Sequence, residues 1–162
     1  MHALVAYGSK MGGTQGLAEM VGDELEKNGF DVDVIDARQV AGVEPYDAVV
    51  VGGALYAARW HRAARRFVRR HRRALSQRPV WLFSSGPLDD SAAAQELPPV
   101  RHARRAMERI GARGHMTFGG RLRADAKGFP ASAMAREQAG DWRDSDHVAH
   151  WVKEIAEDLH AG

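Results

Sequence analysis

The sequence predicts an α/β fold in which a doubly wound, five-stranded parallel sheet carries helices on both faces. Two observations predict it. Short apolar runs alternate with helix-length amphipathic segments along the 162-residue chain, which is the pattern of successive β–α–β units. A glycine-rich turn, Gly8–Thr14, also joins the first apolar run to the first helical segment. Five strands in one such sheet are expected in the spatial order 2-1-3-4-5.

The predicted strands are the apolar runs that glycine, proline or polar residues bound on each side. The second run alternates between apolar and charged residues, which indicates an edge strand with one face in water. The third contains a continuous apolar stretch, typical of a buried central strand. The five runs are His2–Tyr7, Phe30–Asp36, Tyr46–Leu55, Pro79–Gly86 and His115–Gly120.

The predicted helices lie between these runs and after the last one. They are Thr14–Asn28, Trp60–Leu75, Pro98 to about Ile110, and a final helix capped by Asp144 or Ser145. The final helix carries an apolar stripe at helical spacing, made of Val148, Trp151, Val152, Ile155 and Leu159. We expect one domain over 1–162, with an irregular insertion at about 121–144.

The composition restricts the chemistry. The chain contains no cysteine, which excludes disulfides, thiolate catalysis, cysteine-ligated zinc and iron–sulfur clusters, so redox chemistry would need a bound cofactor. The formal net charge is +2. No apolar run reaches the ~20 residues of a membrane span, and no signal peptide is recognisable. We expect a cytoplasmic protein and leave peripheral membrane contact open.

The turn between the first strand and the first helix predicts a phosphate site. A triphosphate-binding loop needs lysine after its last glycine, where this chain has Thr14, and a dinucleotide loop needs glycine where this chain has Met11. The hydroxyls of Ser9 and Thr14, together with N–H groups at a helix start, suit one terminal phosphomonoester without a metal. A plain strand–helix turn is the alternative.

Two further loops are predicted at the same edge of the sheet, because the carboxyl ends of parallel strands meet there. The loop after the third strand contains Tyr56 and Trp60, on which a flat ring could stack. The loop Ser84–Leu88 after the fourth strand would close the other side. Ordinary packing of the two aromatic side chains is the alternative.

On these motifs the chain resembles the flavodoxin-like FMN-binding family, and within it the menaquinone-dependent protoporphyrinogen oxidase branch. The resemblance is carried by GSKMGGT (Gly8–Thr14), by Val49–His71 and by Asp141–Ala156. It implies that FMN is the cofactor. It implies a phosphate site of Ser9, Lys10, Met11, Gly12, Gly13 and Thr14, and a ring flanked by Ala54, Leu55, Tyr56, Ala57, Trp60, Ser84, Ser85, Gly86, Pro87 and Leu88.

Two residues on the loop beside the ring are candidate catalytic residues. Arg59 would stabilise negative charge on a reduced flavin, and His61 could exchange protons near the ring. A solvent-facing histidine at a helix start is the alternative for His61. We expect no metal site, because His147 and His150 have the spacing of a ligand pair but no evident further ligand.

The resemblance implies an FMN-dependent oxidoreductase that moves reducing equivalents between an organic donor and a quinone-like acceptor. The alternative is a flavodoxin-type electron-transfer protein without its own substrate. A cavity over the flavin walled by Phe129, Met134 or Trp142 would favour the enzyme. The arginine-rich segment Arg59–Arg73 is a solvated helix face, or it contacts an acidic partner protein or a membrane surface. Nucleic acid is disfavoured as a partner, because no groove-reading element is evident.

Overall fold

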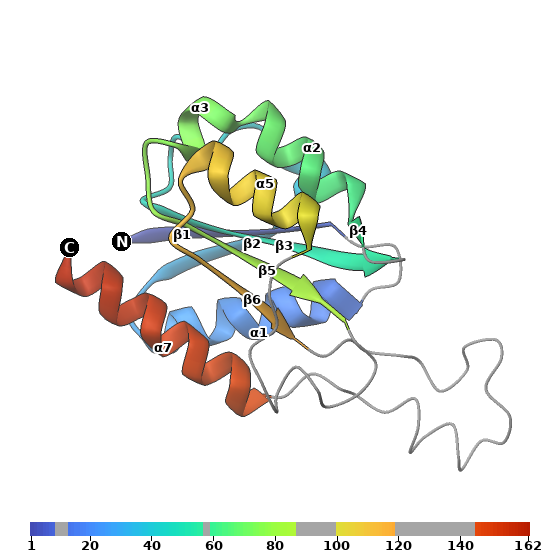
Figure 1. Cartoon of the computed structure of the whole chain (residues 1–162). Coiled ribbons are helices and arrows are strands. Elements are labelled where there is room, and N and C mark those ends of the chain that lie inside the picture. Colours follow the sequence, from blue (N-terminus) through green and yellow to red (C-terminus); the bar gives the residue numbers. More distant parts are fainter. Residues whose placement is uncertain (9–12, 57–58, 87–99, 119–144) are drawn as a thin grey trace, which may run out of the picture.

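Five parallel strands form the centre of the molecule, and their order confirms the predicted fold class (Figure 1). The structure is a computed structural model that describes residues 1–8, 13–56, 59–86, 100–118 and 145–162. Hydrogen bonding places the strands in the order β2-β1-β3-β5-β6, which is the predicted 2-1-3-4-5 arrangement of the parallel strands. Their bounds are β1 His2–Gly8, β2 Asp31–Asp36, β3 Ala48–Tyr56, β5 Val80–Ser85 and β6 Gly114–Phe118.

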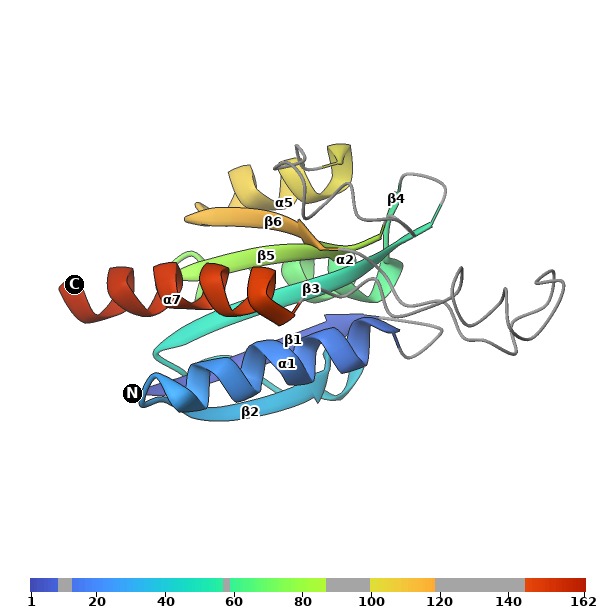
Figure 2. The ribbon, with the colours of Figure 1, turned by 90° about the horizontal axis from the view of Figure 1, so that it is seen from below.

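Helices cover both faces of this sheet (Figures 1 and 2). One face carries α1 (Gly13–Lys27) and α7 (Ser145–Ala161), which pack against each other. The other face carries α2 (Arg62–Arg70), α3 (Arg72–Leu75) and α5 (Arg101–Ile110), together with a short 3₁₀ helix, η1 (Ala37–Gln39). Such two-sided cover explains why the central strands are apolar on both faces, whereas the edge strand β2 is only partly buried.

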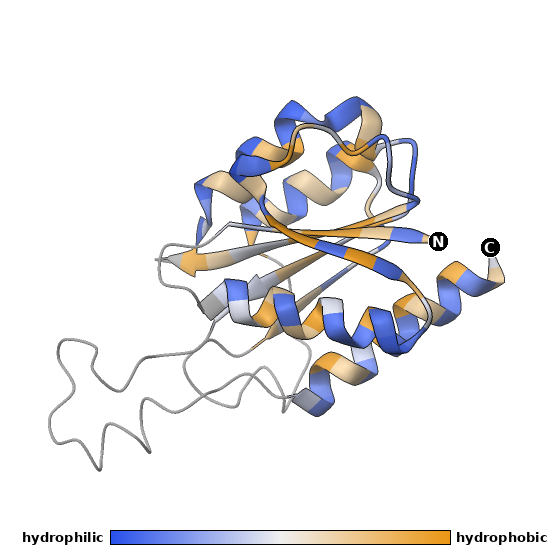
Figure 3. Cartoon of the chain, turned by 180° about the vertical axis from the view of Figure 1, so that it is seen from behind, coloured by the Kyte–Doolittle hydropathy of each residue, from blue (hydrophilic) through white to orange (hydrophobic). Residues whose placement is uncertain are grey.

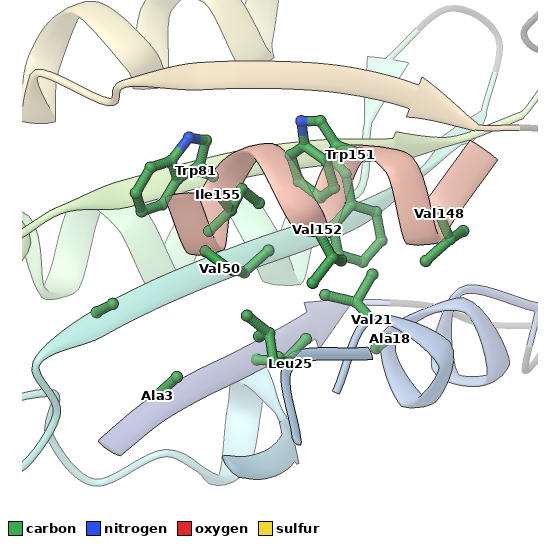
Figure 4. Packing of buried hydrophobic residues seen from close by; sticks show 14 of the residues in the cluster. Ala3, Ala18, Val21, Leu25, Val50, Trp81, Val148, Trp151, Val152 and Ile155 are labelled. Atoms are coloured by element: carbon green, nitrogen blue, oxygen red, sulfur yellow. The ribbon is translucent and has the colours of Figure 1, made fainter. Parts of the chain in front are cut away.

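Each face of the sheet has its own hydrophobic core. On the α1/α7 face the apolar stripe of the last helix is buried as predicted, and the Trp151 ring centroid lies 5.3 Å from that of Phe118. Figure 4 shows Val21 and Leu25 of α1 together with Val152 of α7, beside Val50 of β3. Hydropathy follows the same division, because the strands are mostly hydrophobic while the helices alternate between hydrophobic and hydrophilic residues (Figure 3).

The helix predicted over Trp60–Leu75 is wrong at its start and in its continuity. Trp60 belongs to a two-residue strand, β4 (Arg59–Trp60), which pairs antiparallel with the end of β3. The indole Nε1–H of Trp60 donates to the carbonyl of Phe83 at 3.1 Å. This contact across the sheet keeps Trp60 out of the helix, which begins at Arg62 after the cap residue His61. The helix ends at Arg70, and α3 follows after His71.

The other predicted boundaries need smaller corrections. The structure starts α1 at Gly13, extends β1 to Gly8, and describes α5 from Arg101. The predicted start of α5 at Pro98 and the predicted insertion at 121–144 lie outside the described residues. None of the described helices is long and apolar enough to cross a membrane.

The topology brings the predicted loops to one edge. All five parallel strands end there, and the register places Gly8 of β1 beside Gly53 of β3, which lies beside Ser84 of β5. The chain leaves β1 toward α1 on one face and leaves β3 toward α2 on the other (Figure 1). This divergence between neighbouring strands creates the crevice in which α/β sheets of this kind bind ligands.

Candidate functional site

Thr14 lies in the first turn of α1 and is the described residue that most clearly fits an anion. Its side chain is 1% exposed, and its hydroxyl Oγ1 is buried without a hydrogen-bond partner among the described residues. Leaving such a group unsatisfied costs about 1–3 kcal/mol. The first turn of α1 contains no acidic side chain, and a helix start favours negative charge. An anionic oxygen bound here would accept a hydrogen bond from the Thr14 hydroxyl and would be stabilised by the start of α1.

The described part of the predicted phosphate site therefore fits a phosphate. Gly13 is the first residue of α1 and supplies an N–H at the helix start. Ser9, Lys10, Met11 and Gly12 lie outside the described residues.

Close packing at Gly8 joins the end of β1 to the start of α2. A Cβ atom at Gly8 would lie 2.8 Å from the backbone nitrogen of Ala64 and 3.0 Å from Nδ1 of His61. No other residue fits there without displacing backbone, so glycine is required by the approach of α2. The same approach places His61 next to the strand end that leads into the phosphate loop.

His61 and Arg59 both lie at this edge, as predicted. His61 is the N-cap of α2, and its Nδ1 accepts the backbone N–H of Ala63 at 3.0 Å. Because Nδ1 is an acceptor, the neutral ring carries its proton on Nε2, and a second proton could bind only at Nδ1, in place of the cap bond from Ala63. Arg59 is exposed and lies opposite Tyr56 in the β3–β4 pair.

The residues of β3 and β4 that were predicted to flank the flavin ring differ in their exposure. Ala54 is buried and Leu55 is half-buried, whereas Tyr56 ends β3 with a side chain outside what is described. Trp60 is 1% exposed, and a Cβ at Gly53 would lie 2.5 Å from its Nε1. The indole of Trp60 thus packs directly on the Gly53 backbone, and it could stack on a flavin only if one of its faces became exposed. Stacking of Trp60 on the flavin stays a prediction. Ala57 lies outside the described residues.

The predicted residues of the loop after β5 are also only partly described. The Ser84 hydroxyl is buried and lies 2.8 Å from Nε2 of His115. Ser85 is buried, and the backbone N–H of Gly86 donates to the carbonyl of Phe118 at 2.9 Å, which ties this loop to β6. Pro87 and Leu88 lie outside the described residues, as do Phe129, Met134 and Trp142, which were expected to wall a cavity.

A basic recess beside the site was not predicted. It has a volume of about 520 Å³ and begins at His61. Its other lining residues are Arg38, Arg62, Ala63, Arg66, Arg69 and Arg70. Arg38 belongs to it because η1 follows β2 directly and so reaches the same edge. The position of Arg38 two residues after the second predicted strand was the available signal.

Asp36 is the one acidic residue among the last residues of the five parallel strands, and its carboxylate is paired with Arg38. Its carboxylate accepts hydrogen bonds from Nε and Nη2 of Arg38 at 3.1 and 2.8 Å. These bonds hold the pKa of Asp36 below its usual range, which keeps it ionised and paired. The net charge near His61 is therefore set by arginine.

The histidines of the last helix have other neighbours. His150 lies 3.2 Å from Glu154 through Nε2, and the ring centroid of His147 lies 4.7 Å from that of Phe118. Within the described ranges, no group of three potential ligands could hold a metal ion.

Comparison with known proteins identifies the family. A family model described as a flavodoxin domain matches residues 4–136. No curated protein shows significant similarity to the chain. Among solved structures, a cysteine-to-serine mutant of flavodoxin from Pseudomonas aeruginosa is 14% identical, with a TM-score of 0.66 and 99% of each chain covered. The Streptococcus pneumonia TIGR4 flavodoxin is 18% identical, with a TM-score of 0.60 and 99% of each chain covered.

The same fold also occurs as part of a larger protein. Rubredoxin oxygen:oxidoreductase from Desulfovibrio gigas is 13% identical and has a TM-score of 0.56, with 94% of this chain but 36% of that chain covered. None of these comparisons supports the protoporphyrinogen oxidase branch.

A flavodoxin domain implies FMN as cofactor. The buried hydroxyl of Thr14 and the acid-free start of α1 fit its phosphate. The strand order, the position of the candidate phosphate site at the start of α1 and the match over residues 4–136 agree with one another. The chain belongs to the flavodoxin domain family, whose fold binds FMN and transfers electrons.

Proposed function

We propose that the protein is an FMN-dependent oxidoreductase that passes reducing equivalents between an organic donor and a quinone-like acceptor. FMN supplies the redox-active ring, and the protein sets its orientation and electrostatic surroundings. The observation that carries the proposal is the positive charge where the strands end. Arg59 is exposed there, the basic recess begins at His61, and Asp36 is bonded to Arg38.

This charge has a chemical consequence for the site. A neighbouring cation favours the charged form of an anion, so Arg59 would stabilise the negative charge that a flavin gains on full reduction. His61 would donate a hydrogen bond from Nε2–H, and it would take up a proton at Nδ1 only when the cap bond from the Ala63 N–H opens. Together these residues support transfer of electrons in pairs, which reduction of an organic substrate requires.

The second candidate is an electron-transfer protein without its own substrate. The observation that favours it is the extent of the structural match, because this chain and the solved flavodoxins from Pseudomonas aeruginosa and Streptococcus pneumonia each cover 99% of the other.

An anaerobic reductive titration of the FMN-loaded protein separates the two candidates. The oxidoreductase proposal expects the flavin bands to bleach in one two-electron step, followed by reoxidation with a soluble quinone. Two well-separated one-electron steps, without quinone reduction, would assign the protein as a carrier. A colourless protein that takes up no added FMN would contradict both candidates.

A further inference from the structure

Charge is segregated between the two helical layers of the molecule. The layer of α2, α3 and α5 contains eleven arginines and one carboxylate, Glu108. All of these arginines are exposed except Arg65, which is half-buried. We call them the arginine face: Arg62, Arg65, Arg66, Arg69, Arg70, Arg72, Arg73, Arg101, Arg104, Arg105 and Arg109.

The opposite layer has the reverse composition. Helices α1 and α7 contain eight carboxylates and two lysines, Lys27 and Lys153. The carboxylates are Glu19, Asp23, Glu24, Glu26, Asp146, Glu154, Glu157 and Asp158. The formal net charge of +2 therefore conceals a basic helical layer and an acidic helical layer, and Figure 1 shows these two layers on opposite sides of the sheet.

The arginine face is not neutralised from within the described chain. None of its arginines forms an ion pair with a carboxylate among the described residues, whereas Arg38 and Arg113 outside it do so with Asp36 and Asp158. Like charges at helical spacing repel one another and destabilise the helix. The neighbouring His102 has a lowered pKa, first because it is partly desolvated and then because several of these arginines lie near it. An uncompensated field of this kind favours a bound anion.

Two recesses give this face a shape as well as a charge. The first, of about 520 Å³, lies beside α2 and runs from His61 past Arg66. The second, of about 330 Å³, lies between α2 and α5 and is lined by Arg105 and Arg109 among others. Arg69 lines both recesses, so they adjoin at this residue of α2. Guanidinium groups bind carboxylates in a two-pronged geometry, and such recesses admit side chains that project from a partner.

We infer that the arginine face is the docking surface for an acidic redox partner protein, whose carboxylates enter the two recesses. The inference rests on the proposed function, because the first recess begins at His61, beside the predicted flavin site. A membrane is less suited as the occupant. Among the described residues the one exposed large apolar side chain is Met1, which precedes β1, so the arginine face offers none to insert into a bilayer. A nucleic acid has the required charge but would not exchange electrons.

Binding of a fluorescent decaglutamate peptide tests this assignment at low and at physiological salt. R66E/R69E reverses charge in the first recess and, through Arg69, at the edge of the second, whereas R105E/R109E reverses charge in the second recess alone. K27E/K153E is the matched control, because it changes the net charge equally on the acidic layer. Each arginine double variant is expected to weaken peptide binding by about tenfold, and salt should weaken binding to the wild type. The control should bind like the wild type, and circular dichroism confirms that each variant is folded.

Several results would overturn the inference. One is an equal loss of peptide binding in all three double variants, and another is no peptide binding by the wild type. The others are binding to a short DNA duplex or to phosphatidylserine vesicles that is tighter than binding to the peptide, and self-association of the protein at low salt through its basic and acidic layers. FMN affinity is measured on the same samples. A protein that binds FMN but not the peptide contradicts only the docking surface, whereas one that binds the peptide but not FMN contradicts the proposed function.

Discussion

Ser84 and His115 form a buried pair between neighbouring strands, with 2.8 Å between the serine Oγ and the histidine Nε2. Ser84 is fully buried and His115 is 9% exposed. The other ring nitrogen of His115, Nδ1, is also buried, and among the described residues it has no hydrogen-bond partner. A second proton on this ring would therefore have to be accommodated without water, and burial lowers the pKa of His115 to about 4.

This pair predicts acid sensitivity. An unfolded histidine has a pKa of about 6.5, so between pH 6.5 and 4 the unfolded chain binds a proton that the folded chain excludes. The stabilisation is complete above the unfolded pKa and is lost as the pH falls toward 4, by about 3 kcal/mol. Urea unfolding at a series of pH values measures this loss. In H115N, which cannot titrate in this range, the free energy of unfolding should fall less steeply with decreasing pH. An unchanged dependence on pH would assign the acid sensitivity to other groups.

Thr14→Val should weaken FMN binding. The substitution keeps the shape of the side chain but removes the buried hydroxyl, and a hydrogen bond to a charged group is worth about 1.5–3 kcal/mol. The dissociation constant should therefore rise by roughly 10- to 150-fold. Thr14→Ser is the control that keeps the hydroxyl and should retain most of the affinity. Equal affinity of the valine variant and the wild type would show that this hydroxyl does not contact the phosphate.

His61 is expected to have two separable roles. His61→Ala removes the side chain that caps α2 and should lower the free energy of unfolding by about 1 kcal/mol. His61→Asn supplies another capping oxygen and should restore that stability, but it cannot exchange protons at neutral pH. If the ring of His61 exchanges a proton or donates a hydrogen bond in turnover, both variants should reduce a quinone more slowly. Wild-type turnover in a stable asparagine variant would leave His61 with the capping role alone.

The hydrogen bond of Trp60 should contribute measurably to stability. Trp60→Phe keeps an aromatic ring over Gly53 but removes the indole N–H that donates to the buried carbonyl of Phe83. Loss of a partner for a buried group costs about 1–3 kcal/mol, which thermal unfolding can detect. Met20→Leu, a conservative change on α1, serves as a control for general sensitivity to apolar substitution. A phenylalanine variant as stable as the wild type would mean that this bond contributes little.

The sheet and its flanking helices could be predicted because their signals are local. Alternation of apolar runs with amphipathic helices appears directly in the chain, and the buried stripe from Val148 to Leu159 follows from helical spacing. Trp60 was misassigned because its spacing from Ala64 and Phe67 also fits a helix. Its actual partners, Leu55 and the carbonyl of Phe83, are tertiary contacts that periodicity does not report.

The surface features needed the fold before they could be recognised. The run of arginines after Trp60 is evident in the sequence. The arginines of α5 lie on the same face only because the crossover helix between β5 and β6 packs on the same side of the sheet as α2. Arg38 reaches the recess because β2 lies at the edge beside β1. The candidate phosphate site was predictable at Thr14, where a helix start follows a glycine-rich turn.

Titration of the purified protein with FMN, followed by absorbance and by flavin fluorescence, tests the central claim most directly. We predict saturable binding of equimolar FMN with bound-flavin bands, release of FMN on denaturation, and a weaker dissociation constant for Thr14→Val than for Thr14→Ser. A folded protein whose addition leaves the spectrum and fluorescence of FMN unchanged would contradict the assignment of the start of α1 as a flavin phosphate site.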